Sequence, residues 1–125
     1  MSINLDGSKP IFQQMAELIT EAILTEAYPE ESQIPSITEF SVSYNINPAT
    51  ALKGVNILVD EGLLYKKRGL GMFVANGARQ KLTARRKEGF YQDFICPMLA
   101  EARRLALSEN ELANLIERGK VNHDY

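Results

Sequence analysis

The stretch from Asn45 to Gly62 constrains the fold of this 125-residue chain more than any other. Asn47 is a favoured N-cap, Pro48 suits the first helical position, and Gly62 lies where a left-handed residue closes a helix. At about 100° per residue, the side chains between these residues separate into two faces. The apolar side contains Ala51, Leu52, Val55, Leu58 and Val59, and the opposite side contains Ala49, Thr50 and Lys53. The outer face suits a DNA major groove, but taken alone the pattern also fits an ordinary surface helix with one lysine.

A shorter helix is predicted immediately before this one. Ser36 and Glu39 have the spacing of a capping box, in which each side chain satisfies a backbone amide of the other residue. The helix that they open ends near Ser43, and a tight turn then leads to Asn47. Two helices joined by so short a turn, the second with a polar outer face, indicate a helix-turn-helix.

The period of the sequence changes after Gly62. Residues 63–66 and 72–75 are short runs of β-prone side chains, and a loop with two glycines, Gly69 and Gly71, lies between them. Lys66, Lys67 and Arg68 place three consecutive cations at the entrance of this loop. A hairpin directly after a helix-turn-helix is a wing, so the chain is predicted to be mainly α with a small β-hairpin.

Helical patterns flank the predicted winged helix-turn-helix on both sides. A core helix is expected over residues 10–27, with Ser8 as its N-cap. A long helical pattern reaches about Leu107, and Gly89 and Pro97 are expected to interrupt it. Ser108 opens a second capping box, and the last helix is expected to stop at Gly119, with a frayed tail from about residue 120.

The composition argues against enzymatic chemistry. Cys96 is the only cysteine and His123 the only histidine, so neither a metal-binding cluster of these residues nor a histidine-based nucleophile is expected, and no cofactor is predicted. The chain shows no basic-then-apolar leader and no apolar run of membrane-spanning length, which favours the cytoplasm. The net charge of −2 excludes a general polycation but not a specific DNA-binding protein, because such proteins concentrate their positive charge locally.

The string from Pro10 to Val74 closely resembles the DNA-binding domain of GntR-type bacterial transcription regulators. The matching pieces, in the family's order and spacing, are Pro10–Gln14, Ile34–Ser36, Asn47–Thr50, Glu61–Leu64 and Arg68–Val74. The short remainder is similar to the YtrA-like subgroup, whose C-terminal part is a small helical dimerisation element. The resemblance implies a homodimeric, sequence-specific repressor that binds a palindromic double-stranded DNA operator, with transporter operons among the expected targets.

The resemblance and the helical geometry together predict the residues that contact DNA. They are Ser36, Thr38, Asn47, Ala49, Thr50, Lys53, Lys67, Arg68, Gly69 and Gly71. Family members usually carry arginine where this chain has Thr38, so the usual reading of guanine from this position is expected to be weak or lost. Arg85, Arg86 and Lys87 can also reach phosphates, although a solvated helix face is the preferred interpretation of this run.

Residues 1–76 are assigned to the winged helix-turn-helix, and residues 77–125 to a helical dimerisation region. A kinked helix and one short helix cannot enclose the apolar residues that this region carries, so a second copy is expected to cover them. The predicted dimerisation residues are Phe90, Phe94, Met98, Leu105, Leu112, Leu115 and Ile116. Some of this stripe could instead pack on the N-terminal helix.

Two further alternatives stay open at this stage. A winged-helix module for protein–protein contact predicts a recognition face and a wing without cations, and Lys53, Lys66, Lys67 and Arg68 argue against it. A small-molecule effector could bind between the wing and the C-terminal helices, but no cluster of polar residues marks such a site.

Overall fold

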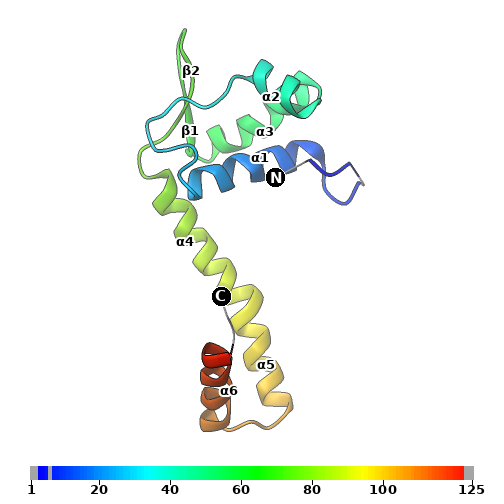
Figure 1. The fold of residues 1–125 in the computed structure, drawn as a ribbon, viewed down its shortest axis with the longest axis vertical. Helices are drawn as coiled ribbons and strands as arrows, with labels where there is room; N and C mark the ends of the chain where they lie inside the picture. Colours follow the sequence, from blue (N-terminus) through cyan, green and yellow to red (C-terminus); the bar gives the residue numbers. More distant parts are fainter. Residues whose placement is uncertain (1–2, 6, 123–125) are drawn as a thin grey trace. The chain divides into compact units, whose positions relative to one another are not determined.

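The computed structural model describes residues 3–5 and 7–122 of the chain. Its elements are α1 (Ile11–Leu24), α2 (Ile37–Tyr44), α3 (Pro48–Asp60), β1 (Leu64–Lys67), β2 (Gly71–Val74), α4 (Ala78–Phe90), the π-helical turn η1 (Tyr91–Ile95), α5 (Cys96–Arg104) and α6 (Glu109–Asn122) (Figure 1). The predicted fold class is confirmed, since the chain is mainly helical with one antiparallel hairpin. The chain divides into two compact units within α4: unit 1, residues 1–84, and unit 2, residues 85–125.

The core of unit 1 lies between α1, α3 and the hairpin. Met15, Ile19 and Ile23 recur along one face of α1 and are almost completely buried. The first turns of α4 also belong to this core, through Ala78 and Leu82. The other buried apolar residues of the cluster are Ala16, Ile34, Phe40, Ala51, Val55, Leu58, Leu63, Leu64 and Val74. Burial of such side chains is worth roughly 1.5–3 kcal/mol each for the larger ones, so α4 is tied to unit 1 by its own apolar residues.

Helices α1 and α3 approach closely at Gly54. An added Cβ at this residue would lie 2.7 Å from the carbonyl oxygen of Phe12 and 3.0 Å from the Cβ of Met15. Only a residue without a side chain leaves room for the α1 backbone at this crossing. The glycine therefore sets how closely α3 packs on the helix behind it.

The predicted caps of the helix-turn-helix are confirmed. The Ser36 hydroxyl oxygen accepts from the Glu39 amide at 3.1 Å, and the Glu39 carboxylate accepts from the Ser36 amide at 3.0 Å. The Asn47 side chain accepts from the Ala49 amide at 2.8 Å. Gly62 adopts φ of +76°, and the following amide bonds back to the Leu58 carbonyl oxygen at 2.9 Å, which closes α3.

A third, shorter extended segment lies beside the hairpin. Strands β1 and β2 pair from Leu64↔Val74 to Lys67↔Gly71. Residues 31–34 run alongside β2, where the Ile34 amide donates to the Met72 carbonyl oxygen at 3.0 Å. This extended segment leads into α2, so backbone hydrogen bonds join the wing to the residues directly before the helix-turn-helix.

Several boundaries and contacts in unit 1 differ from the sequence prediction. Helix α1 begins after Pro10 without a side-chain cap, so Ser8 is not its N-cap, and it ends at Leu24 rather than near residue 27. Both strands lie about one residue from their predicted positions. Leu52 is 45% exposed and is not part of the buried stripe. The stripe is narrower than predicted because the glycine at 54 brings the α1 backbone onto the other flank of α3.

In unit 2, Pro97 alters the helix without ending it. Cys96 donates its amide to the Tyr91 carbonyl oxygen in a π-helical turn that precedes the proline, and α5 continues beyond it. This wider turn accommodates the hydrogen bond that proline cannot donate.

Three expectations for unit 2 are wrong. Gly89 and Gly119 lie inside α4 and α6 and interrupt neither helix, since isolated glycines cost a helix only about 1 kcal/mol. The Ser108 capping box is confirmed, but its helix runs to Asn122, so the chain is not frayed from residue 120. His123 and the rest of the expected tail lie outside the described residues.

Candidate nucleic-acid interface

The outer face of α3 borders a shallow groove in unit 1. The groove has a volume of about 400 Å³ and is lined by Ala49, Leu52, Lys53, Asn56, Ile57 and Asp60. The cap at Asn47 and the buried face of α3 fix the rotation of the helix, so these residues face away from the core, except Ile57, which packs partly against it. Of the predicted contact residues, Ala49 and Lys53 lie on this face, whereas Thr50 is half-buried at its edge. The expected polar outer face is thus present, but Thr50 lies at its edge, and Leu52 and Asn56 lie on it.

Asn56 and Leu52 are the functional candidates on this face that the sequence prediction missed. An asparagine amide offers one donor and one acceptor side by side, the pattern that matches the major-groove edge of adenine. Leu52 is an exposed apolar group that can contact a thymine methyl. The helical period already places Asn56 on the same face as Ala49 and Lys53, so the signal for Asn56 was present in the sequence. Asp60 ends the face, because its carboxylate repels phosphate.

Lys53 lies at the border between α3 and α1. Its Nζ stands 4.0 Å from the centre of the Phe12 ring, a cation–π contact. The contact holds the ammonium beside the outer face rather than over its middle. This position suits a phosphate at the edge of a groove better than a base at its floor.

The N-terminus of α2 presents Ser36 and Thr38. The Ser36 oxygen is used as a cap acceptor, which leaves its hydroxyl proton free to rotate toward an outside acceptor. Thr38 is exposed in the first turn of α2. Both groups are short neutral donors, so they can bind phosphate oxygens without the fork of an arginine.

Aromatic rings support the cation at the end of β1 next to the wing loop. The Tyr65 and Phe73 rings pair across the strands with centroids 5.9 Å apart, and the Lys67 Nζ lies 4.4 Å from the Phe73 centroid. The Tyr65 hydroxyl donates to the Glu31 carboxylate at 2.6 Å, and this hydrogen bond raises the pKa of Tyr65 above its ordinary value. The rings therefore orient Lys67 along one face of the hairpin.

Backbone geometry forms the tip of the wing. Gly69 and Gly71 have φ of +78° and +126°, conformations that favour glycine. The Gln33 side-chain amide donates to the Leu70 carbonyl oxygen at 2.5 Å and occupies the space beside Gly71. Arg68 is exposed immediately before Gly69. The glycines shape the loop and Gln33 supports it, so Arg68 is a cation exposed at the tip of the wing.

The predicted DNA-contact residues all belong to unit 1. They come from the start of α2, the first half of α3 and the hairpin, which extends beyond these helices in Figure 1. Among the described residues, no three His, Cys, Asp or Glu side chains gather to hold a metal. None of the described helices is both long and apolar enough to cross a membrane. What unit 1 offers is a cation-flanked helix face beside a wing.

The chain is similar to known proteins in both sequence and fold. No protein-family model matches the chain. A transcriptional regulator of the GntR family from Bacteroides thetaiotaomicron has a TM-score of 0.73 and 30% identity, covering 91% of this chain and 99% of that one. YtrA from Sulfolobus acidocaldarius, a GntR-family transcription factor, has a TM-score of 0.57 and 26% identity, covering 98% and 100%. The DNA-binding domain of AraR in complex with operator ORX1 has a TM-score of 0.53 and 28% identity, covering 60% and 90%.

The helix-turn-helix with its hairpin is a winged helix-turn-helix of the kind found in transcription regulators. The chain belongs to the GntR family, and its likeness to YtrA extends over almost its whole length. It spans only 30% and 31% of the length of two curated relatives that it matches at 32% identity.

Proposed function

We propose that this protein is a homodimeric transcriptional repressor that binds a palindromic double-stranded DNA operator through unit 1. The observation that carries the proposal is the outer face of α3. Leu52, Lys53 and Asn56 line a groove on this face, and the first two turns of the helix hold no acidic side chain. The wing adds Lys67 and Arg68 as further cations. Helix α3 would enter the major groove, and the wing would contact the backbone or the minor groove.

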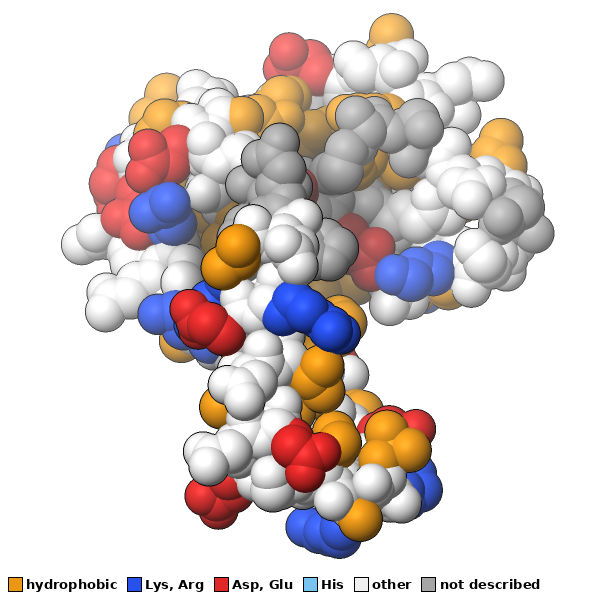
Figure 2. All heavy atoms as spheres, turned by 60° about the horizontal axis from the view of Figure 1, so that its bottom comes forward, with side chains coloured by type: hydrophobic (Ala, Val, Ile, Leu, Met, Phe, Trp, Pro, Cys, Tyr) orange, Lys and Arg blue, Asp and Glu red, His pale blue; other side chains and the backbone are white. Residues whose placement is uncertain are grey.

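The surface of unit 2 supports the dimer. Phe90, Phe94 and Leu105 are 57%, 64% and 61% exposed, and the rings of Phe90 and Phe94 contact each other at 5.7 Å between centroids. Figure 2 shows apolar side chains on the surface of the C-terminal helices. Among the described residues of unit 2, only Ala102 is a buried apolar side chain. A second copy would cover this surface and would place two recognition helices about one DNA turn, or a multiple, apart.

The alternative of a protein–protein module fits these observations less well. It predicts neither cations on the wing nor an amide and an ammonium on the outer face of α3. The likeness to a DNA-bound domain also favours the repressor.

Lys53→Ala is expected to weaken binding almost equally on all DNA sequences, because its ammonium is placed to contact phosphate. The measurement is fluorescence anisotropy on two duplexes, one selected by the protein from a randomised pool and one random, over a range of salt concentrations. The slope of log affinity against log salt should fall by about one unit. Arg104→Ala is the matched control, since it removes one exposed cation from unit 2 and should leave both affinities unchanged. Unaltered binding by Lys53→Ala on both duplexes would contradict the placement of α3.

Asn56→Ala is expected to weaken binding to the selected duplex alone. Loss of a paired donor and acceptor on adenine should cost about 1–3 kcal/mol there, with little change on the random duplex. The same anisotropy assay measures both values. Equal weakening on the two duplexes would mean that Asn56 contacts the backbone rather than a base.

A further inference from the structure

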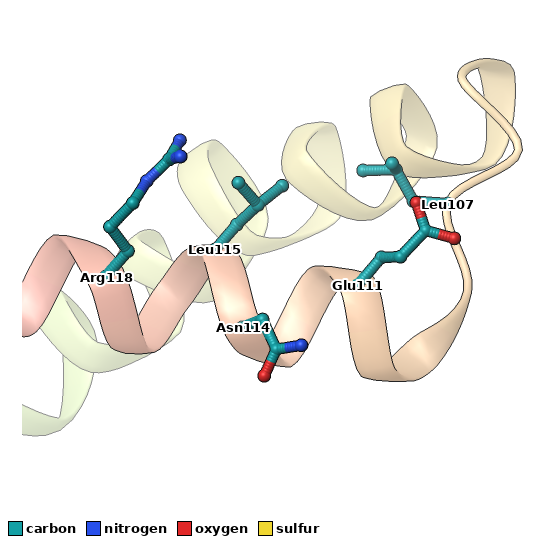
Figure 3. A pocket seen from close by; sticks show the side chains of 5 residues that line it. All are labelled: Leu107, Glu111, Asn114, Leu115 and Arg118. Atoms are coloured by element: carbon teal, nitrogen blue, oxygen red, sulfur yellow. The ribbon is translucent and has the colours of Figure 1, made fainter.

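A groove on α6 carries charge at both ends and apolar side chains between them. It has a volume of about 410 Å³ and is lined by Leu107, Glu111, Asn114, Leu115 and Arg118. Glu111, Leu115 and Arg118 rise from the same side of α6, and Leu107 comes from the loop before it (Figure 3). Leu115 is 42% exposed. The groove lies entirely within unit 2, outside the DNA-binding surface.

The spacing of these residues forms one line along the helix. Glu111, Leu115 and Arg118 follow each other at intervals of four and three residues, which places them on one face over two turns. The backbone positions of Glu111 and Arg118 are therefore separated by about 10 Å along the axis, at about 1.5 Å per residue. Among the described residues, Arg118 forms no ion pair. Its charge is thus available to a partner.

This line is complementary to itself when the direction is reversed. In an antiparallel pair of α6 helices, a two-fold axis between Asn114 and Leu115 brings residue 111 of one copy opposite residue 118 of the other. Each Glu111 then meets an Arg118, and the two Leu115 side chains meet beside the axis. A parallel pair would instead place like charges opposite each other at both ends, which is unfavourable.

We infer that this groove is the surface on which a second copy of the chain docks, with the two α6 helices antiparallel and Glu111 of each copy paired with Arg118 of the other. The inference rests on the proposed homodimer and adds its orientation and its specificity. Leu107 and Leu115 supply the apolar middle of the contact. The two ion pairs select the antiparallel arrangement.

The test is a charge exchange between two full-length variants, Glu111→Arg and Arg118→Glu. Each variant alone would place two like-charge pairs in its homodimer, so the dissociation constant should rise at least tenfold in sedimentation equilibrium at low salt. An equimolar mixture of the two variants restores both opposite-charge pairs and should form a heterodimer about as tightly as the wild-type chain. Glu109→Arg is the matched control, because it makes the same charge change in the first turn of α6 away from the groove.

The outcomes separate the two proposals. Dimers that resist both single substitutions, or a mixture that fails to recover, would overturn the antiparallel α6 contact while the homodimer stands. A wild-type chain that is monomeric at micromolar concentration would overturn the homodimer itself. Recovery in the mixture also shows that the single variants remain folded.

Discussion

Gly54→Ala is expected to lower the free energy of unfolding by about 1–3 kcal/mol, even though alanine is the better helix former. The new methyl group would lie 2.7 Å from the Phe12 carbonyl oxygen, which is backbone and cannot rotate away. Helix α1 must then move off α3, and Met15, Ile19 and Val55 lose part of their packing. The outer face of α3 should shift with it.

Urea unfolding followed by circular dichroism measures this loss, and Gly89→Ala is its control. Gly89 is also inside a helix, but an added Cβ there meets no atom within 4 Å. The same substitution should therefore stabilise α4, by about 0.5–1 kcal/mol. If both variants were stabilised, the close approach of α1 and α3 at Gly54 would be wrong.

A chain that ends at Ala84 is expected to be monomeric and to bind the selected duplex at least ~100-fold more weakly than the full chain. Two linked DNA-binding units gain about 10²–10⁴ in avidity over one when both half-sites can be occupied together. The truncated chain keeps every predicted DNA-contact residue, so its binding to a single half-site should be unchanged. Light scattering gives the oligomeric state, and anisotropy on full and half sites gives the two affinities.

The truncated chain must keep the first turns of α4 to retain the core of unit 1. A chain that stopped at Asn76 would lose Ala78 and Leu82, which are 1% and 2% exposed in the core of unit 1. Loss of one such leucine costs about 2–5 kcal/mol, so weak binding by that shorter chain would report unfolding. If the chain ending at Ala84 stays dimeric, unit 2 does not make the dimer.

Local signals in the sequence were sufficient to predict the elements of unit 1. The caps at Ser36 and Asn47 and the turn at Gly62 depend on residues within a few positions, and each is present as predicted. Contacts between distant segments could not be predicted in the same way. The exposure of Leu52 depends on how α1 crosses α3, and no pattern within α3 contains that information.

The sequence predicted the kind of site but not all of the residues that form it. Lys53 was expected on the outer face and lies there, yet its contact with Phe12 joins residues from two helices. Gln33 gave no signal, because an isolated glutamine in an extended segment has no helical or turn pattern. In unit 2, the presence of Pro97 predicted a disturbance, but the form of that disturbance depends on the whole helix around it. The assignment of residues 77–125 to dimerisation stays a prediction.

The tether between Gln33 and the hairpin has a consequence for protein engineering. Residues 31–34 pair with β2, and Gln33 holds the Leu70 carbonyl oxygen from outside the hairpin sequence. A hairpin transplanted alone into another regulator would lack a strand neighbour and the support of its tip. A transferable module that keeps these hydrogen bonds therefore contains residues 29–75, which include the whole helix-turn-helix, and it also needs α1, on which α3 packs. Wings of this design should be exchanged together with their recognition helices rather than separately.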